Sequence, residues 1–321
     1  MNNNLYLKFT NDWIDYFYKI MVKLGFVNYI EGNENISIDY IMKDGIKKIG
    51  LRYDYYNISF NPNINYNYIK KYPSGSYDRE WNYSNLSYNP SITWNDFQND
   101  KNHNWDLNGF CSKKSLTWND FLKNEKLIHN FKLLSKNPNI NIEIILNNPK
   151  YLHLWDFYEL SKNKNVTFET IIKEKKLKWS INGLCQNPNV TWNIVNENPN
   201  INWKYDILSL NENITFDIVE KNVDKKWCYK NLSRNSNITW NIISSNPSLE
   251  WNLEFFLYNK NLTLESLEII LNKIKKIDEK TKIYIGRHNF KIDKANYMLD
   301  CYKKWFTNHV LENILKKINY T

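Results

Sequence analysis

Hydrophobic and polar positions recur along this chain with a period of 24 residues. The clearest marker is a Thr or Asn that follows Ile, Val or Leu and precedes another apolar residue by four positions. Successive markers are separated by 24, 24, 26, 24, 24, 24 and 24 residues, and degenerate copies at Asn65 and Ser37 extend the series by steps of 28. Self-similarity at such a period is the signature of a tandem-repeat protein. The markers are Thr93, Thr117, Asn141, Thr167, Thr191, Thr215, Thr239 and Thr263.

Each marker predicts the start of a helix, which we call helix A. Thr is a preferred N-cap because its hydroxyl accepts a hydrogen bond from an unpaired amide of the first turn. The apolar residues before the marker and four after it occupy the two positions of a hydrophobic staple. Helix A is expected to end near an Asn-Pro pair, because a residue before proline is pushed out of the helical region. These pairs are Asn148-Pro149, Asn198-Pro199 and Asn246-Pro247.

A second helix, helix B, is predicted from an aromatic residue that stands twelve positions after the marker once insertions are allowed for. A Leu-Ser pair or a relative of it follows five and six positions later, before a second Asn-Pro such as Asn187-Pro188. Helices of about two turns do not persist alone in water, so neighbouring copies must stack to bury their apolar rows. The aromatic residues are Tyr53, Trp81, Trp105, Trp155, Trp179, Trp203, Trp227 and Trp251, with His129 as the exception.

The fold class that follows is all-α: an α-solenoid of about nine helix-pair repeats of ~24 residues, with helical caps at both ends. We expect an N-terminal helical cap over residues 1–34, the tandem-repeat solenoid over 35–275 and a C-terminal helical cap over 276–321. A leucine-rich-repeat-like β-solenoid is the alternative, because 24 residues is also a normal period there. The apolar residues that suggest the two caps are Trp13, Phe17, Met21 and Leu24, and Tyr297, Cys301 and Trp305.

The net charge of +9 changes this picture little. Lys outnumbers Arg by roughly ten to one and Asn makes up roughly a sixth of the chain, which is far from average usage. Both Lys and Asn have AT-rich codons, so the composition is attributed mainly to an AT-rich genome. A net positive charge can also indicate nucleic acid or an anionic membrane as a partner. Of these two, nucleic acid remains an open alternative.

Residues that could carry chemistry are scattered. No two cysteines have CxxC spacing, and Cys111 and Cys185 replace the Ser of the Leu-Ser pair, which predicts small, reduced, core-facing residues. The histidines form no cluster with the spacing of metal ligands. Gly-rich phosphate loops and the nucleophile-elbow and metalloprotease motifs are absent from the sequence. We therefore predict no catalytic residue, no metal, no cofactor and no enzymatic activity. The remaining residues are Cys228 and Cys301, and His103, His129, His153, His288 and His309.

The N-terminal segment lacks the basic and apolar regions of a secretory signal peptide. The apolar stretch over residues 13–26 is broken by Asp15, Lys19 and Lys23, so it is too polar to span a membrane. An intracellular protein with no membrane partner is expected.

The segments NPNVTWNIV and NSNITWNII, at residues 187–195 and 235–243, share one register with the Trp and Leu-Ser positions between them. In this register the chain resembles the asparagine-rich NPNITW tandem-repeat proteins of mimivirus-type giant viruses, over roughly residues 35–270. The resemblance implies a viral protein made in an infected protist, acting in the host cytoplasm or in the virion. It implies no catalytic residues.

Two functions remain open. The first is a non-enzymatic scaffold that binds another protein, which follows by analogy from the repeat architecture. The second is a basic nucleic-acid-associated repeat protein that uses the lysine-rich edge formed by the A-to-B linkers, although Glu125, Glu174 and Asp224 dilute the charge of that edge. The Trp row is interpreted as core and not as a platform for stacked bases. The linker lysines are Lys123, Lys126, Lys173, Lys175, Lys176, Lys178, Lys221, Lys225 and Lys226.

Overall fold

The computed structural model describes residues 55–73, 80–124, 130–274 and 277–288, together with residues 18–19, 21–23, 25, 32–33 and 36. The chain divides into two compact units. The central unit comprises Tyr53–Leu262, and the terminal unit comprises Met1–Arg52 with Thr263–Thr321. All secondary structure of the described residues is helical, which confirms the all-α class. The β-solenoid alternative is wrong for this part of the chain, because no strand occurs at any described marker.

The A helices begin directly after their markers, as predicted. In every one the side chain of the marker accepts a hydrogen bond from the backbone N–H three residues later, and Thr93, Thr117 and Thr263 complete a reciprocal capping box. Ends at Leu146, Glu197 and Ser245 also confirm the stop near Asn-Pro. These helices are α5 Tyr66–Lys71, α7 Trp94–Asn99, α9 Trp118–Leu122, α11 Ile142–Leu146, α13 Phe168–Lys173, α15 Trp192–Glu197, α17 Phe216–Lys221, α19 Trp240–Ser245 and, in the terminal unit, α21 Leu264–Lys273.

The B helices are shorter than predicted. Most are a single turn of four residues, and they begin two positions after the aromatic residue instead of at it. The tryptophan lies outside the helix because its ring reaches back to the preceding A helix: Trp203 Nε1 donates to the backbone carbonyl of Asn198 at 3.0 Å. The B helices are α4 Tyr55–Ile58, α6 Tyr83–Tyr88, α8 Asn108–Cys111, α10 Phe131–Leu134, α12 Phe157–Lys162, α14 Ile181–Leu184, α16 Tyr205–Leu208, α18 Tyr229–Leu232 and α20 Leu253–Phe256.

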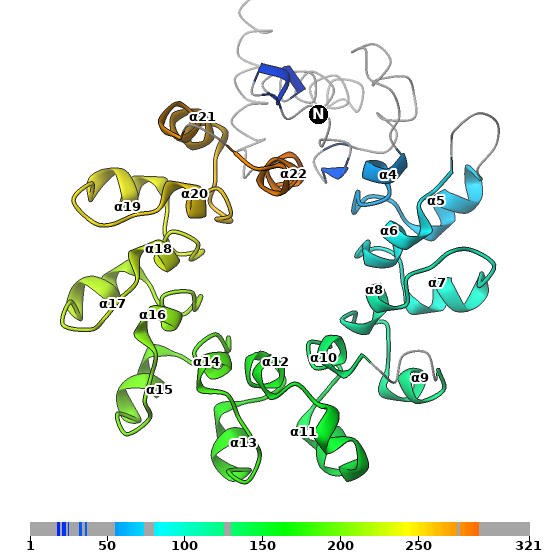
Figure 1. The fold of residues 1–321 in the computed structure, drawn as a ribbon, viewed down its shortest axis with the longest axis horizontal. Helices are drawn as coiled ribbons and strands as arrows, with labels where there is room; N and C mark the ends of the chain where they lie inside the picture. The colour runs from blue at the N-terminus through cyan, green and yellow to red at the C-terminus, as the bar shows by residue number, and fades with distance from the viewer. Residues whose placement is uncertain are drawn as a thin grey trace, which may run out of the picture. The chain divides into compact units, whose positions relative to one another are not determined.

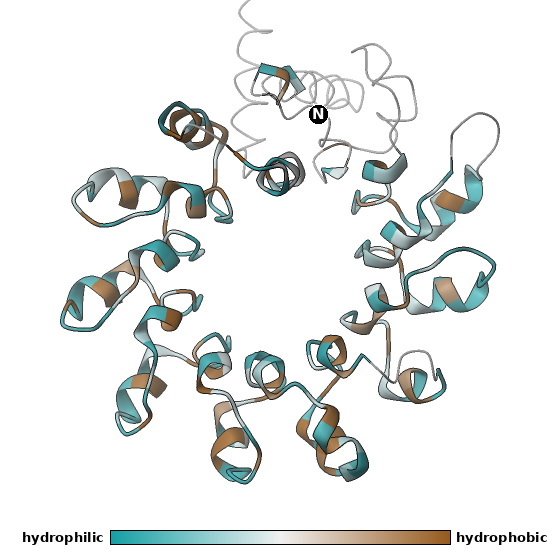
Figure 2. Cartoon of the chain, in the orientation of Figure 1, coloured by the Kyte–Doolittle hydropathy of each residue, from teal (hydrophilic) through white to brown (hydrophobic). Residues whose placement is uncertain are grey.

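Within the central unit the B helices form one row and the A helices form a second row beside it (Figure 1). Hydrophobic stretches of the helices alternate with hydrophilic turns along both rows (Figure 2). The core contains three recurring apolar positions, all nearly inaccessible to water: the residue before each marker, the residue four after it, and the Leu of the Leu-Ser pair. One copy, for example, contributes Val190, Val195 and Leu208. Burial of these side chains supplies the stabilisation that such short helices lack alone.

The single step of 26 residues has a structural counterpart. The linker that contains its two extra residues forms a 3-10 helix, η4 Pro149–Leu154, between α11 and α12. Insertions at this edge leave the flanking helices in register, since both α11 and α12 keep their capped starts at Asn141 and Asp156.

Most residues of the predicted caps lie outside the described residues: Trp13, Phe17, Leu24, Tyr297, Cys301 and Trp305. Met21 is helical and fully buried in the terminal unit. The same unit holds α22 Glu279–Arg287, and Asn33 Nδ2 donates to the carbonyl of His288 at 2.8 Å. In the part of the chain that is described, no helix has both the length and the hydrophobicity that crossing a bilayer requires.

Candidate functional site

A row of buried asparagines joins each 24-residue segment to the one before it. Asn211 Nδ2 donates to the backbone carbonyls of Cys185, Asn187 and Val190, at 2.9, 3.1 and 3.4 Å. Its Oδ1 accepts the backbone N–H of Asn213 at 2.9 Å. The side chain therefore satisfies buried carbonyls that would otherwise have no partner. This asparagine row consists of Asn89, Asn137, Asn163, Asn187, Asn211, Asn235 and Asn259.

The sequence analysis missed this role. A signal was present, because an Asn stands two positions after the Leu-Ser pair in nearly every copy. Codon bias raises the Asn content everywhere and does not select one buried position, so it does not explain the row. A second asparagine two residues further on adds to it: Asn237 Nδ2 donates to the carbonyls of Glu212 and Ile214, at 2.6 and 3.1 Å.

The Ser of the Leu-Ser pair links neighbouring B helices. Ser209 Oγ donates to the carbonyl of Tyr205 at 2.8 Å and accepts the backbone N–H of Cys228 at 3.0 Å. Cys185 takes the same position, and its Sγ accepts the N–H of Lys204 at 3.5 Å. Cys111 and Cys185 are free and buried, as predicted. Burial raises the pKa of the Cys111 thiol to about 11, so it stays protonated and is a poor nucleophile at neutral pH.

Lys113 replaces the asparagine in one copy. Its Nζ donates to the carbonyls of Asn89 and Ile92, at 2.7 and 2.9 Å, and lies 4.7 Å from the ring centroid of Phe110. Burial lowers the pKa of Lys113 to about 7, although Asp96 opposes the shift. The lysine thus reproduces the donor role of the asparagine with a group that is costly to bury when charged.

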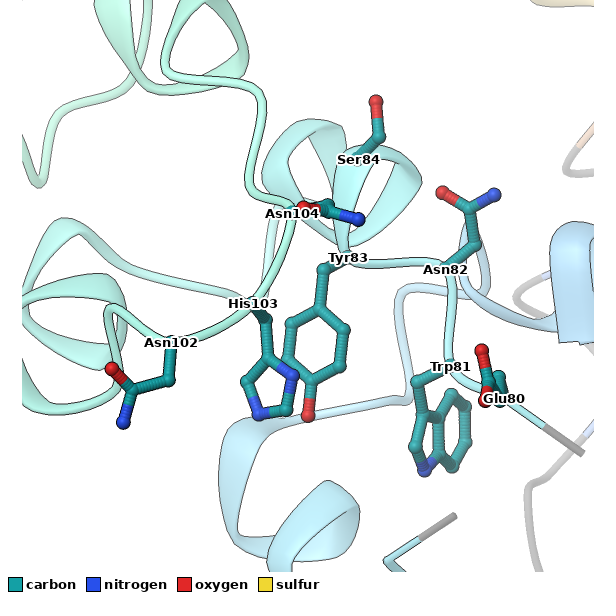
Figure 3. Close-up of a pocket in the computed structure, with 8 residues that line it drawn as sticks. All are labelled: Glu80, Trp81, Asn82, Tyr83, Ser84, Asn102, His103 and Asn104. Carbon is teal, nitrogen blue, oxygen red and sulfur yellow. The ribbon is translucent and has the colours of Figure 1, made fainter.

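One group of titratable side chains that borders a cavity surrounds His103. The cavity, of about 530 Å³, is lined by Trp81, Tyr83 and the segment around His103 (Figure 3). The imidazole stacks on the Tyr83 ring, with centroids 3.7 Å apart and planes within 4°. His103 Nε2 lies 3.2 Å from Asp100 Oδ2, and Tyr66 Oη donates to the same oxygen. Burial, followed by the hydrogen bond to Asp100, raises the pKa of Tyr66.

This arrangement can accept hydrogen bonds and offers a flat aromatic face. Figure 3 shows Ser84, the one hydroxyl besides Tyr83 at the cavity, pointing away from His103. The described residues contain no group of three His, Cys, Asp or Glu side chains placed to bind a metal. His153 is exposed and His288 is buried in the terminal unit, while His129 and His309 lie outside the described residues.

The linker lysines predicted as a basic edge are exposed, apart from the half-buried Lys225, and Lys126 lies outside the described residues. Two of them pair with acids of their own segment: Lys221 Nζ lies 2.9 Å from Asp217 Oδ2, and Lys225 Nζ lies 2.9 Å from Asp224 Oδ2. These exposed pairs contribute little to stability, but they neutralise part of the edge.

Trp81, Trp155 and Trp203 of the tryptophan row are buried, whereas Trp105, Trp179, Trp227 and Trp251 are half-buried. Trp203 is 6% exposed, and its ring centroid lies 6.3 Å from that of Phe168 in the preceding copy. The corresponding pairs Trp192–Trp227 and Phe216–Trp251 are both separated by 5.9 Å. The burial of Trp203 confirms it as a core residue, and each of these rings packs against an aromatic ring of the preceding copy.

No family model, curated protein or solved structure matches this chain. Its function is therefore inferred from the contacts and surfaces described above.

Proposed function

We propose that the chain is an α-solenoid of stacked helix pairs that acts as a non-enzymatic scaffold and binds another protein along its extended surface. One observation carries the proposal: the asparagine row bonds each segment to backbone carbonyls of the segment before it, as Asn235 does with Ser209, Asn211 and Ile214. Backbone acceptors are present whatever the neighbouring side chains are. The stack is therefore maintained by a few fixed positions, and the outer positions are free to vary.

Variation at the exposed positions of the B helices favours a protein partner. The second residue of four successive B helices is Asn182, Asp206, Lys230 and Glu254, and all four side chains are exposed. A polyphosphate chain is bound best by a cation that recurs at one position of every copy. Because the charge at this position changes from copy to copy, the surface suits a partner whose own charges are irregularly spaced, such as a folded protein.

The alternative is a nucleic-acid-associated protein, favoured by the exposed lysines of the linkers. The Lys221–Asp217 and Lys225–Asp224 pairs are evidence against it, because a neighbouring carboxylate partly neutralises each lysine and weakens its attraction to phosphates. The resemblance to giant-virus repeat proteins adds the proposal that the scaffold acts in an infected cell or in the virion.

To test this, the full-length chain is tagged, crosslinked to its partners in the cells that make it, and captured by its tag. The molecules that are recovered with it are then identified. Half of each sample is treated with nuclease before capture. A protein partner that is retained after nuclease, and absent from a tag-only control, supports the scaffold. Partners that disappear with nuclease support the nucleic-acid alternative and overturn the scaffold, as does recovery of nothing beyond the control.

A further inference from the structure

The 26-residue step removes one bond that the other copies keep. Trp203, Trp227 and Trp251 donate from Nε1 to the carbonyl of the residue five positions earlier, at 3.0, 2.8 and 2.9 Å. Trp155 keeps the usual ring position, with centroids 5.7 Å from Trp118 and 4.9 Å from Phe131. Its Nε1 is buried and has no hydrogen-bond partner among the described residues. The 3-10 helix η4 is therefore not tied to the tryptophan as the shorter linkers are.

A cavity of about 390 Å³ opens where this linker departs from the others. Leu152, Trp155 and Phe157 line it from η4 and the start of α12. Lys176, Leu177 and Lys178, from the linker that follows α13, line it as well. The cavity is thus mainly apolar inside and has two lysines at its wall, and it is large enough for one aromatic or branched side chain.

The helices that precede the two linkers, and η4 itself, carry exposed apolar side chains. Leu146 on α11, Leu154 on η4 and Ile172 on α13 are 44%, 40% and 40% exposed. Leu146 and Ile172 share one helix position, five after the marker, and the later A helices carry Asn196, Glu220 and Ser244 there. The two A helices α11 and α13 thus expose an apolar side chain where the later ones expose a polar one.

The two lysines of the cavity carry uncompensated charge. Lys176 and Lys178 are exposed and pair with no acid in the described part of the chain. In the corresponding linker between α17 and α18, Lys225 pairs with Asp224 at 2.9 Å. Unpaired positive charge therefore lies at the wall of this cavity, where it complements a carboxylate.

We propose that this cavity is the docking site for an acidic and hydrophobic segment of the partner protein. One apolar side chain of the segment enters between Leu152, Phe157 and Leu177, and a neighbouring carboxylate pairs with Lys176 and Lys178. The inference rests on the proposed scaffold function and names the place and the chemistry of its partner. The apolar side chain of such a segment fills the apolar part of the cavity, whereas the phosphates of a nucleic acid satisfy only the lysines.

The test uses the full-length chain and a short fluorescein-labelled peptide in which Glu alternates with Leu and Phe, followed by fluorescence anisotropy. Wild type should bind this peptide and should not bind peptides with Lys in place of Glu or Ser in place of Leu and Phe. The double variant Lys176→Glu, Lys178→Glu should weaken binding by about tenfold or more. The matched variant Lys225→Glu, Lys226→Glu carries the same charge change in a linker without the cavity, and it should bind like wild type.

A second variant separates the cavity from charge alone. Deletion of Leu152 and His153 restores the 24-residue step, so it should close the cavity, abolish peptide binding and leave the helical circular dichroism and the melting temperature at or above those of wild type. Absence of binding by wild type, equal loss in both double variants, or full binding by the deletion variant overturns the site. None of these outcomes affects the scaffold function, which is decided by nuclease-resistant protein partners.

Discussion

Asn235 Nδ2 lies 2.8 Å from the backbone carbonyl of Asn211, the residue that holds the same position 24 residues earlier. Asn211 in turn donates to the carbonyl of Asn187, and Asn259 donates to that of Asn235. Each of these side chains thus bonds to the backbone of the residue that plays its own role in the preceding segment. Successive segments are thus joined through backbone carbonyls, in addition to the aromatic pairs between copies.

Replacement of Asn235 should be costly. Asn235→Ala leaves the buried carbonyls of Ser209, Asn211 and Ile214 without their donor, and each unsatisfied buried group costs about 1–3 kcal/mol, partly recovered if water enters. We expect the free energy of unfolding in urea to fall by about 3 kcal/mol. Asn241→Ala, at an exposed position of α19, is the matched control and should change it by less than about 0.5 kcal/mol. Equal effects would show that the asparagine row is not a stabilising element.

Trp203→Ala should destabilise the chain by about 3–5 kcal/mol, since it removes a large buried ring and leaves a cavity. Trp203→Phe retains most of the ring contact with Phe168 but loses the bond from Nε1 to the carbonyl of Asn198, so it should cost about 1 kcal/mol. Thermal unfolding followed by circular dichroism measures both. If the alanine variant were as stable as the phenylalanine variant, the tryptophan row would not belong to the core.

Gly183→Ala should destabilise despite the better helix propensity of alanine. A Cβ at position 183 would lie 2.4 Å from the backbone carbonyl oxygen of Tyr158 and 2.9 Å from Ser161 Cβ. The backbone atom cannot rotate away, so α12 and α14 must separate, which we expect to cost about 2 kcal/mol in urea unfolding. The neighbouring Asn182→Ala, at an exposed position of the same helix, should be neutral or slightly stabilising. A stable Gly183→Ala variant would mean that the two B helices are not in close contact.

The sequence predicted the A helices well because their starts depend on local chemistry. Thr191 needs only its own first turn to act as an N-cap, and the residues before and after it specify the staple without reference to other copies. The single-turn B helices were predicted too long, since the tryptophan was assigned to the helix. The tryptophan instead donates to a carbonyl at the end of the preceding A helix, such as that of Asn222 for Trp227. The Asn that stands five positions before Trp203, Trp227 and Trp251 was a local signal that the helix assignment did not use.

The sequence showed the recurring Asn of the asparagine row, but it showed neither the partners of that row nor the cavity beside η4. Both arise from contacts between segments: Asn187 bonds to residues 21 to 26 positions away, and the cavity combines Leu152 with Leu177 across two linkers. The sequence did show the anomaly that produces the cavity, as the 26-residue step to Thr167. The two extra residues remove the hydrogen bond from the tryptophan Nε1 to the carbonyl five positions earlier, since Trp155 Nε1 has no partner among the described residues. Only the three-dimensional structure shows this.

Lys113→Asn should stabilise the chain, and most strongly at acidic pH. Lys113 loses its proton near pH 7 in the folded chain and near its ordinary pKa of 10.5 in the unfolded chain. Between these values the unfolded chain binds more protons, so the free energy of unfolding of wild type rises with pH, by up to about 1.4 kcal/mol per pH unit. The advantage of the asparagine variant should therefore be largest below pH 7 and shrink toward pH 10. Urea titrations of both proteins at several pH values measure the difference, and a difference that does not vary with pH would contradict the buried, easily deprotonated lysine.

The last prediction separates the two functions through the basic edge. A protein that neutralises several phosphates loses affinity steeply with salt, and log K falls by about 0.9 for each duplex phosphate contacted. We expect no micromolar binding of duplex DNA or single-stranded RNA at physiological salt, because Lys221 and Lys225 pair with Asp217 and Asp224 and the exposed positions of the B helices alternate in charge. Anisotropy titrations at two salt concentrations measure this for wild type and for a variant with Lys175, Lys176, Lys225 and Lys226 changed to Ser. Weak binding that the four substitutions leave unchanged agrees with the scaffold. Tight, steeply salt-dependent binding that the substitutions abolish would mean that lysines of several linkers bind the phosphates of one nucleic-acid molecule. That result would contradict the scaffold proposal and support the nucleic-acid alternative.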